Sequence, residues 1–111
     1  MKGKYRLTRA SDFKRVRRSG RSFAHPLAVI VVATGEAQNS RVGIITGSSV
    51  GKAVKRNRIK RQLKEVFRAL IPGFKKNVDI VVIARTLINE VSYSEIQAAI
   101  LQLLERAEII G

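Results

Sequence analysis

The sequence predicts a single small α/β domain, and three observations support this fold class. The chain has 111 residues, which is enough for one domain with one modest hydrophobic core. Two nearly continuous β-prone runs, Leu27–Thr34 and Val78–Ala84, are typical of strands covered on at least one face. The segment between these runs carries apolar residues at helical spacing, so strands and helices alternate along the chain.

The charge of the chain is its most unusual property, with a net value of +14. Nine of the 22 Lys and Arg residues lie in residues 1–25 and ten in residues 51–76, whereas five acids outnumber two bases from residue 77 onward. A polyanion would neutralise this surplus, and membrane lipid, an acidic protein and nucleic acid all qualify. No apolar run reaches the roughly 18 residues of a membrane span, and the amino terminus lacks the apolar segment of a signal peptide. We therefore expect a cytoplasmic protein that binds no membrane.

The amino-terminal basic block is expected to contain an arm, a helix and a strand. Residues 1–8 have no periodicity and are predicted to be a basic arm that becomes ordered on binding. Ser11 is predicted to cap a helix that runs through Arg18 and is ended by Gly20. A short strand is expected at residues 21–24.

Two strands and a loop follow. After the run 27–34, the polar loop Gly35–Ser40 leads to a second strand at Arg41–Thr46, and the short loop favours an antiparallel hairpin. The glycine- and serine-rich residues 47–51 can bring backbone N–H groups to a phosphate, but their spacing is not that of a Walker loop. Nucleotide hydrolysis is therefore disfavoured.

The next helix is both strongly basic and amphipathic. Its apolar residues fall on one face and are Ile59, Leu63, Val66, Phe67 and Leu70. The opposite face carries Asn57, Lys60, Arg61, Lys64 and Arg68. Arg56 falls near the apolar stripe, so we expect the first turn to overhang the core and to leave Arg56 and Arg58 free. A phosphate-rich partner would explain this ridge, although a charge run can also be simply a solvated face.

The carboxyl-terminal half is expected to complete the sheet and the core. Pro72-Gly73 ends the basic helix, and Val78–Ala84 then forms a strand parallel to the one before the helix. Ser92 and Glu95 form a capping box that opens a final helix with a clean apolar stripe, which we interpret as structural.

Residues suited to catalysis are scarce. His25 is the only histidine and has no obvious orienting carboxylate, and the acids are scattered without the spacing of a metal site. We therefore expect no catalytic residue and no bound metal. Phe13 and Phe23 lie in the first basic block, where exposed rings could stack on unpaired bases. Phe13 could equally anchor the first helix to the sheet.

The segment Lys55-Arg56-Asn57-Arg58-Ile59-Lys60-Arg61, preceded by Gly51 and Ala53-Val54, resembles the Arg-Asn-Arg signature of the bacterial ribonuclease P protein component. The similarity extends over nearly the whole chain. Leu7 to Gly20 resembles the opening helix of that family, Arg41-Val42-Gly43 its central strand and Asp79–Arg85 its late strand.

The resemblance implies a two-layer α+β sandwich of order α-β-β-β-α-β-α. Its mixed sheet would contain a left-handed β-α-β crossover, an exception to the usual hand. It also implies one domain over residues 1–111 and a protein subunit of an endoribonuclease whose catalyst is an RNA. The implied partners are ribonuclease P RNA and precursor tRNA, whose 5′ end is matured by hydrolysis. The protein would be a monomer, present in one copy per RNA, with no cofactor of its own and Mg²⁺ on the RNA.

The resemblance further implies two sets of binding residues. The catalytic RNA would contact Arg56, Asn57, Arg58, Lys60 and Arg61, and we expect the neighbouring Lys52, Lys55 and Lys64 to contact it as well. The 5′ leader of precursor tRNA would lie in a cleft between the first helix and the sheet, and we expect it to contact Phe13, Arg17, Phe23, Val29, Val31 and Arg85.

The chain departs from the family pattern in the expected cleft. Arg17 stands where a second aromatic residue is frequent, Val31 replaces a common tyrosine, and Ser48-Ser49 replaces a lysine pair. These changes predict weaker base stacking and fewer phosphate contacts. Two other functions remain open from the sequence, namely a ribosomal or RNA-chaperone protein that uses the same ridge and, less favoured by the scarcity of acids and histidines, a stand-alone nuclease.

Overall fold

The elements follow one another in the predicted order along the chain. The structure is a computed structural model that describes residues 3–111. The three helices are α1 (Ala10–Ser19), α2 (Ala53–Leu70) and α3 (Tyr93–Arg106). The four strands are β1 (Arg21–Ala24), β2 (Ala28–Thr34), β3 (Arg41–Ile45) and β4 (Val78–Ala84). Short 3₁₀ turns are η1 (Gly3–Tyr5), η2 (Ser48–Val50), η3 (Ile71–Gly73) and η4 (Thr86–Glu90).

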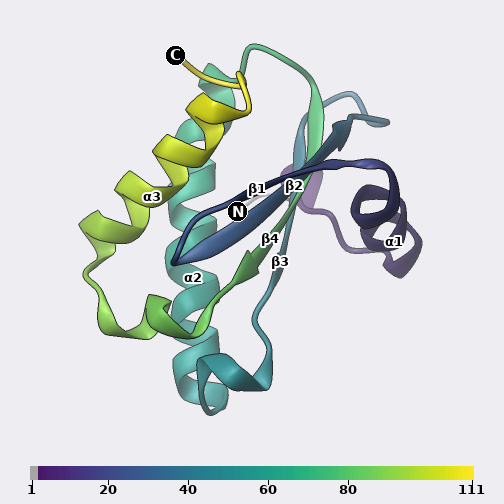
Figure 1. Ribbon diagram of the computed structural model, residues 1–111. Coiled ribbons are helices and arrows are strands. Elements are labelled where there is room, and N and C mark those ends of the chain that lie inside the picture. The colour runs from purple at the N-terminus through teal and green to yellow at the C-terminus, as the bar shows by residue number, and fades with distance from the viewer. Residues whose placement is uncertain (1–2) are drawn as a thin grey trace.

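The strands form one mixed sheet in the order β1-β2-β4-β3 (Figure 1). β3 and β4 are parallel and are connected through α2, which confirms the predicted β-α-β unit. The predicted hairpin between β2 and β3 is wrong, because β4 lies between them and is antiparallel to β2. Six of the seven residues of β4 are buried, on both faces of the sheet. A strand in the centre of the sheet is covered on both faces, whereas a strand at the edge is more exposed, so the apolar sequence of β4 suits its central position.

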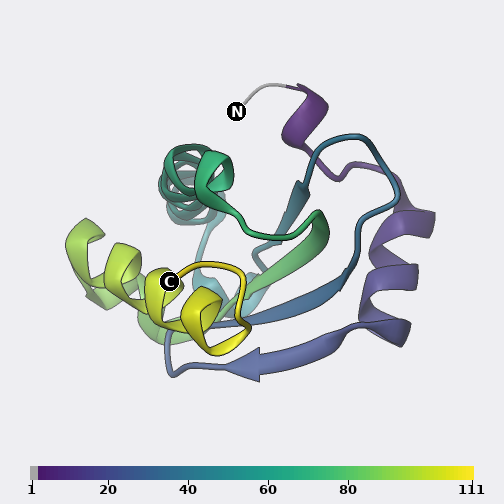
Figure 2. The same ribbon diagram turned by 90° about the horizontal axis from the view of Figure 1, so that it is seen from above.

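Helices cover both faces of the sheet (Figure 2). α2 and α3 pack on one face, where Ile30, Ile80 and Val82 contribute to the main hydrophobic core. α1 packs on the other face, where its Val16 joins Val31 and Val81 in a smaller cluster. The apolar stripe predicted for the basic helix is confirmed, because four of its five residues are buried and Leu70 packs partly buried against the core.

The amino-terminal segment lies against the exposed edge of β3. Leu7 is only 3% exposed and its N–H donates to the Val42 carbonyl at 3.0 Å. Residues 3–8 of the predicted basic arm therefore lie against the sheet, and residues 1–2 lie outside the described residues. The docked segment delivers the chain to α1, which starts at Ala10 after Arg9, so Ser11 lies in the first turn and is not the cap that we predicted.

A buried carboxylate fastens α1 to the sheet. Asp79 in β4 is fully buried, and Arg41 of β3 contacts it through two nitrogens, with Nε at 3.1 Å and Nη2 at 2.9 Å. Arg15 of α1 reaches the same carboxylate at 2.5 Å. Burial acts to raise the pKa of Asp79, but hydrogen bonds and positive charge from Arg41 and Arg15 outweigh it and hold that pKa below its ordinary value. This cluster joins three elements that are distant in sequence.

Candidate nucleic-acid interface

The basic ridge occupies the amino-terminal two thirds of α2 and the residue before it. It consists of Lys52, Lys55, Arg56, Asn57, Arg58, Lys60, Arg61 and Lys64, which are exposed or half-buried. Within residues 3–111 the cations that form ion pairs with carboxylates are Arg15, Arg41 and Arg68, and none of them belongs to the ridge. The ridge therefore presents charge to solvent and keeps it available for an external anion.

The first turn of α2 extends beyond the core, as we predicted. Val54 in this turn is 82% exposed, although it is an apolar residue. Arg58 makes only one long contact, from Nη2 to Asn89 Oδ1 at 3.5 Å. Arg56 is half-buried: its Nε atom is enclosed, and its Nη atoms make no hydrogen bond or ion pair within the described part of the chain. Both guanidinium groups thus retain donors for a ligand.

The ridge continues to α1 across the edge of β3. Lys60 and Lys64 are half-buried, and together with Phe13 and Gly43 they line a small hollow of about 140 Å³. The Phe13 ring lies directly on Gly43, where a Cβ atom would collide with it. Phe13 therefore does anchor α1 to the sheet, and it is also reachable from the ridge.

An apolar row on the α1 face of the sheet remains partly open. The register places Val29 of β2 beside Ile83 of β4, and Ile83 beside Ile45 of β3. All three side chains are half-buried, whereas Val31 and Val81 in the next row are covered by Val16 of α1. The open row is thus a floor beside α1. Sequence reasoning found Val29 but missed Ile45 and Ile83, because only strand pairing brings them together.

Two of the residues predicted for the leader cleft are placed differently by the structure. Phe23 pairs with Ile30 and packs against the α2–α3 core, on the opposite face of the sheet from Phe13. Side chains alternate between faces along a strand, so Phe23 cannot share a face with Val29. Val31 is on the expected face but is only 5% exposed beneath α1, so it supports the floor from within.

Two cations border the open row. Val16 faces the sheet, and Arg15 points from one side of it to Asp79. Successive residues are rotated by about 100° around the helix axis, so the Arg17 side chain extends on the side of Val16 opposite to Arg15, toward the open row. Arg85 continues the extended backbone after β4 and so falls on the same face as Ile83. Both arginines are exposed.

His25 and the acids are the residues that the sequence offered for catalysis or metal binding. Within residues 3–111, no cluster of three His, Asp or Glu side chains is placed to hold a metal ion. His25 serves the turn between β1 and β2, because its Nδ1 accepts a hydrogen bond from the Leu27 N–H at 3.1 Å. Among the described residues, no helix combines the length and apolar character needed to cross a membrane.

Comparisons with known proteins agree with this arrangement. The profile of the Ribonuclease P family matches residues 1–108. The ribonuclease P protein component of Herpetosiphon aurantiacus is 38% identical over 109 residues, which cover 98% of this chain and 89% of that protein. A solved structure of a mutant RNase P protein from Staphylococcus aureus superposes with a TM-score of 0.89 at 30% identity, covering 96% of this chain and 90% of that chain. The RNase P protein of Thermotoga maritima gives a TM-score of 0.82 at 32% identity, over 91% of this chain and 96% of that chain.

The match covers nearly the full length of the chain in sequence and in structure. It includes the helix that carries the ridge, the strands that form the open row and α1 beside it. The chain therefore belongs to the family of bacterial ribonuclease P protein components, the protein subunits of an endoribonuclease in which RNA is the catalyst.

Proposed function

We propose that this protein binds the catalytic RNA of ribonuclease P through the basic ridge and holds the 5′ leader of precursor tRNA beside α1. The observation that carries the proposal is a ridge of cations without carboxylate partners in residues 3–111, which meets Phe13 of α1 at the edge of β3, on the face of the sheet that carries the open apolar row. Guanidinium and ammonium groups contact phosphates of either RNA, whereas an apolar floor suits unpaired bases.

The leader is a single strand, and it suits the open apolar row beside α1. Val29, Ile83 and Ile45 offer apolar contact to its bases, and Arg17 and Arg85 offer phosphate contacts at the borders. Phe13 adds an aromatic surface in the small hollow that it shares with Lys60 and Lys64. Phe23 is left out of this proposal because it lies on the opposite face.

In this proposal the polypeptide supplies position and charge, and one copy acts on each RNA in the cytoplasm. The bond-breaking step belongs to the RNA with divalent metal that the RNA holds, Mg²⁺ above all. By neutralising phosphates of both RNAs, the protein allows the substrate and catalyst to associate at lower Mg²⁺ concentrations.

The test is cleavage of a precursor tRNA by ribonuclease P RNA at low Mg²⁺, with and without this protein. We expect stimulation by the protein with the RNA and no cleavage by the protein alone. Absence of stimulation would favour the ribosomal or RNA-chaperone function that the ridge also permits. Cleavage without the RNA subunit would instead identify a stand-alone nuclease.

A further inference from the structure

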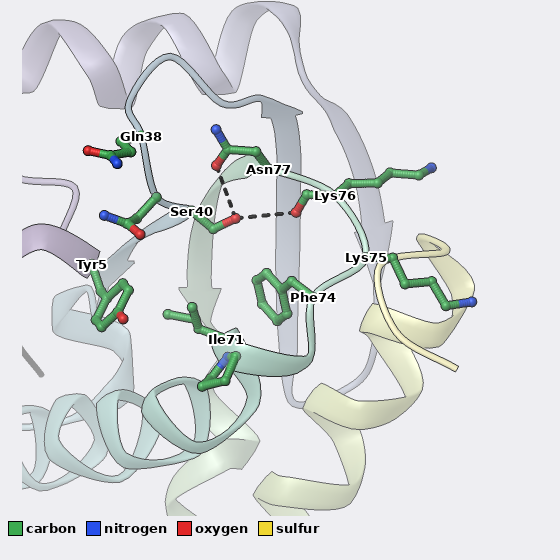
Figure 3. Close-up of a pocket in the computed structure, with 10 residues that line it drawn as sticks. Tyr5, Gln38, Ser40, Ile71, Phe74, Lys75, Lys76 and Asn77 are labelled. Atoms are coloured by element: carbon green, nitrogen blue, oxygen red, sulfur yellow. Dashed lines mark hydrogen bonds between the residues drawn. The ribbon is translucent and has the colours of Figure 1, made fainter.

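A second hollow lies at the carboxyl-terminal end of α2, away from the open row. Figure 3 shows this α2-end hollow, which has a volume of about 300 Å³. Its wall comes from four segments, namely η1, the loop between β2 and β3, η3 and the chain leading into β4. The side chains that matter here are Tyr5, Gln38, Asn39, Ser40, Phe74 and Lys76.

The back of the α2-end hollow is held rigidly. Ser40 is only 7% exposed, and its Oγ accepts the Val78 N–H at 3.0 Å and can donate to Asn77 Oδ1 at 3.3 Å. Asn77 in turn donates from Nδ2 to the Ala37 carbonyl at 2.7 Å. The loop before β3 and the chain before β4 are thereby joined side by side, so the wall is formed before any ligand arrives.

The sides of the α2-end hollow combine aromatic rings with free amides. Tyr5 and Phe74 lie on opposite sides, with Ile71 between them in the view of Figure 3, and both rings are half-buried. Gln38 stands above them (Figure 3), and Asn39 also lines the hollow. Neither amide side chain makes a hydrogen bond within the described residues. Rings that can stack and amides that can donate and accept suit the flat face and polar edge of a nucleobase.

The charged residues that line the α2-end hollow are all positive. None of the ten residues that line it is acidic. Lys75 and Lys76 extend outward from the Phe74 side (Figure 3), and Lys4 lies 5.0 Å from the centre of the Tyr5 ring. The volume is at the lower end for small-ligand sites, which matches a single nucleotide.

We propose that the α2-end hollow binds one unpaired nucleotide of an RNA partner, with the base against the Tyr5 and Phe74 rings and the phosphate at the lysine rim. Residues 6–8 follow Tyr5 and line the small hollow that contains Lys60 and Lys64, so an RNA on the ridge can reach this site along the β3 edge. The inference rests on the proposed function for its RNA partner, but the nucleotide site itself can be tested without that partner.

The first experiment titrates the full-length protein with each of the four 5′-mononucleotides and follows backbone and side-chain amide resonances. We expect saturable shifts of Gln38, Asn39 and Phe74 with nucleotide and none with inorganic phosphate at equal ionic strength. Shifts of equal size with phosphate alone would show that the hollow binds only an anion, and this would overturn the proposal. An absence of shifts with any nucleotide would also overturn it.

The second experiment measures the affinity of variants for ribonuclease P RNA at several salt concentrations. Asn39→Ala removes an amide that has no hydrogen-bond partner among the described residues, and Phe74→Leu keeps an apolar side chain but removes the ring. We expect each to weaken mononucleotide and RNA binding about five- to ten-fold. The salt dependence should stay unchanged, because the lysines that face the phosphates are intact. Gln102→Ala, an exposed amide on α3, is the matched control and should bind as the parent does.

These outcomes separate the two proposals. If the protein stimulates cleavage but nucleotides do not shift the resonances of the α2-end hollow, only the proposed nucleotide site is wrong. If nucleotides bind there but the protein does not stimulate cleavage, the nucleotide site is supported and the proposed function is wrong. Unchanged RNA affinity in both Asn39→Ala and Phe74→Leu, with thermal midpoints like that of the parent, would show that RNA does not use the hollow.

Discussion

At the residue scale, the contact between Gly43 and Phe13 fixes where α1 rests on the sheet. A Cβ atom at position 43 would fall well inside contact distance of the Phe13 ring, and that ring is packed against the sheet. The sequence identifies Phe13 as important, but it cannot reveal that a glycine 30 positions later is the surface beneath it. A glycine in a strand can thus determine where a helix packs, because it leaves space for an aromatic ring from that helix.

We expect Gly43→Ala to destabilise the protein by about 1–3 kcal/mol, because overpacking displaces Phe13 and the start of α1. In a Phe13→Ala background the same change should cost little, so the two substitutions will not be additive. Urea unfolding of the four proteins measures this coupling. Gly47→Ala is the control, since a Cβ atom at position 47 would meet nothing within 4 Å. Additive effects of the two changes would contradict the packing described.

Asp79 is the second residue with a predictable effect. Asp79→Asn leaves Arg15 and Arg41 facing a neutral side chain in a buried site, so we expect a loss of about 3 kcal/mol in unfolding free energy at neutral pH. Glu36→Gln, which alters an exposed partner of Arg15, should change it by less than about 0.5 kcal/mol. Urea unfolding of the parent and both variants at neutral pH measures the two changes.

The pH dependence of this loss has a definite sign. The pKa of Asp79 is lower in the folded protein than in the unfolded chain, so its carboxylate contributes fully above the ordinary value of about 4. That contribution disappears as the pH falls through the lower folded value. The stability difference between the parent and Asp79→Asn should therefore be constant near neutral pH and shrink below about pH 4. A difference that grows on acidification would refute the assignment.

At the scale of elements, α2 divides its two faces between two tasks. Leu63 and Phe67 are fully buried in the main core, while the ridge on the other side lacks carboxylate partners within residues 3–111. This division was predictable from helical periodicity, because the spacing of residues within this one segment assigns each of them to a face. The placement of Phe23 was not predictable in the same way, because it depends on the pairing of β1 with β2.

The ridge predicts a specific effect on RNA binding. Arg56→Ala combined with Arg58→Ala should weaken binding of ribonuclease P RNA. It should also lower the salt dependence by about 0.7–0.9 in log–log slope for each phosphate that is no longer neutralised. Alanine favours helix, so α2 should remain folded. Binding measured at several salt concentrations tests this. Arg106→Ala on α3 is the control, and an equal loss of affinity in that variant would argue against a localised ridge.

At the scale of the whole molecule, the net charge of +14 opposes the compact state. Most cations face solvent, and the ion pairs within residues 3–111 engage only Arg15, Arg41 and Arg68. The unligated protein therefore folds against its own repulsion, and a polyanion relieves that repulsion while it binds.

We expect the thermal midpoint of the free protein to rise as NaCl increases from about 10 mM to about 150 mM, because the screening length falls from about 30 Å to about 8 Å. Calorimetry at fixed neutral pH measures the shift. The Arg56→Ala and Arg58→Ala variant, which has a lower charge, should gain less from added salt. A midpoint that falls over this range would mean that attractive ion pairs outweigh the repulsion.

The sequence by itself determined the order of the helices and strands, the two faces of α2 and the family. These follow from local periodicity and from a motif within one segment. Only the tertiary structure decided the strand order, the face on which Phe23 lies, the Asp79 cluster and the open row of Val29, Ile83 and Ile45. The physical reason is that side chains alternate along a strand, so the partners and register of each strand, set by contacts distant in sequence, decide which residues meet.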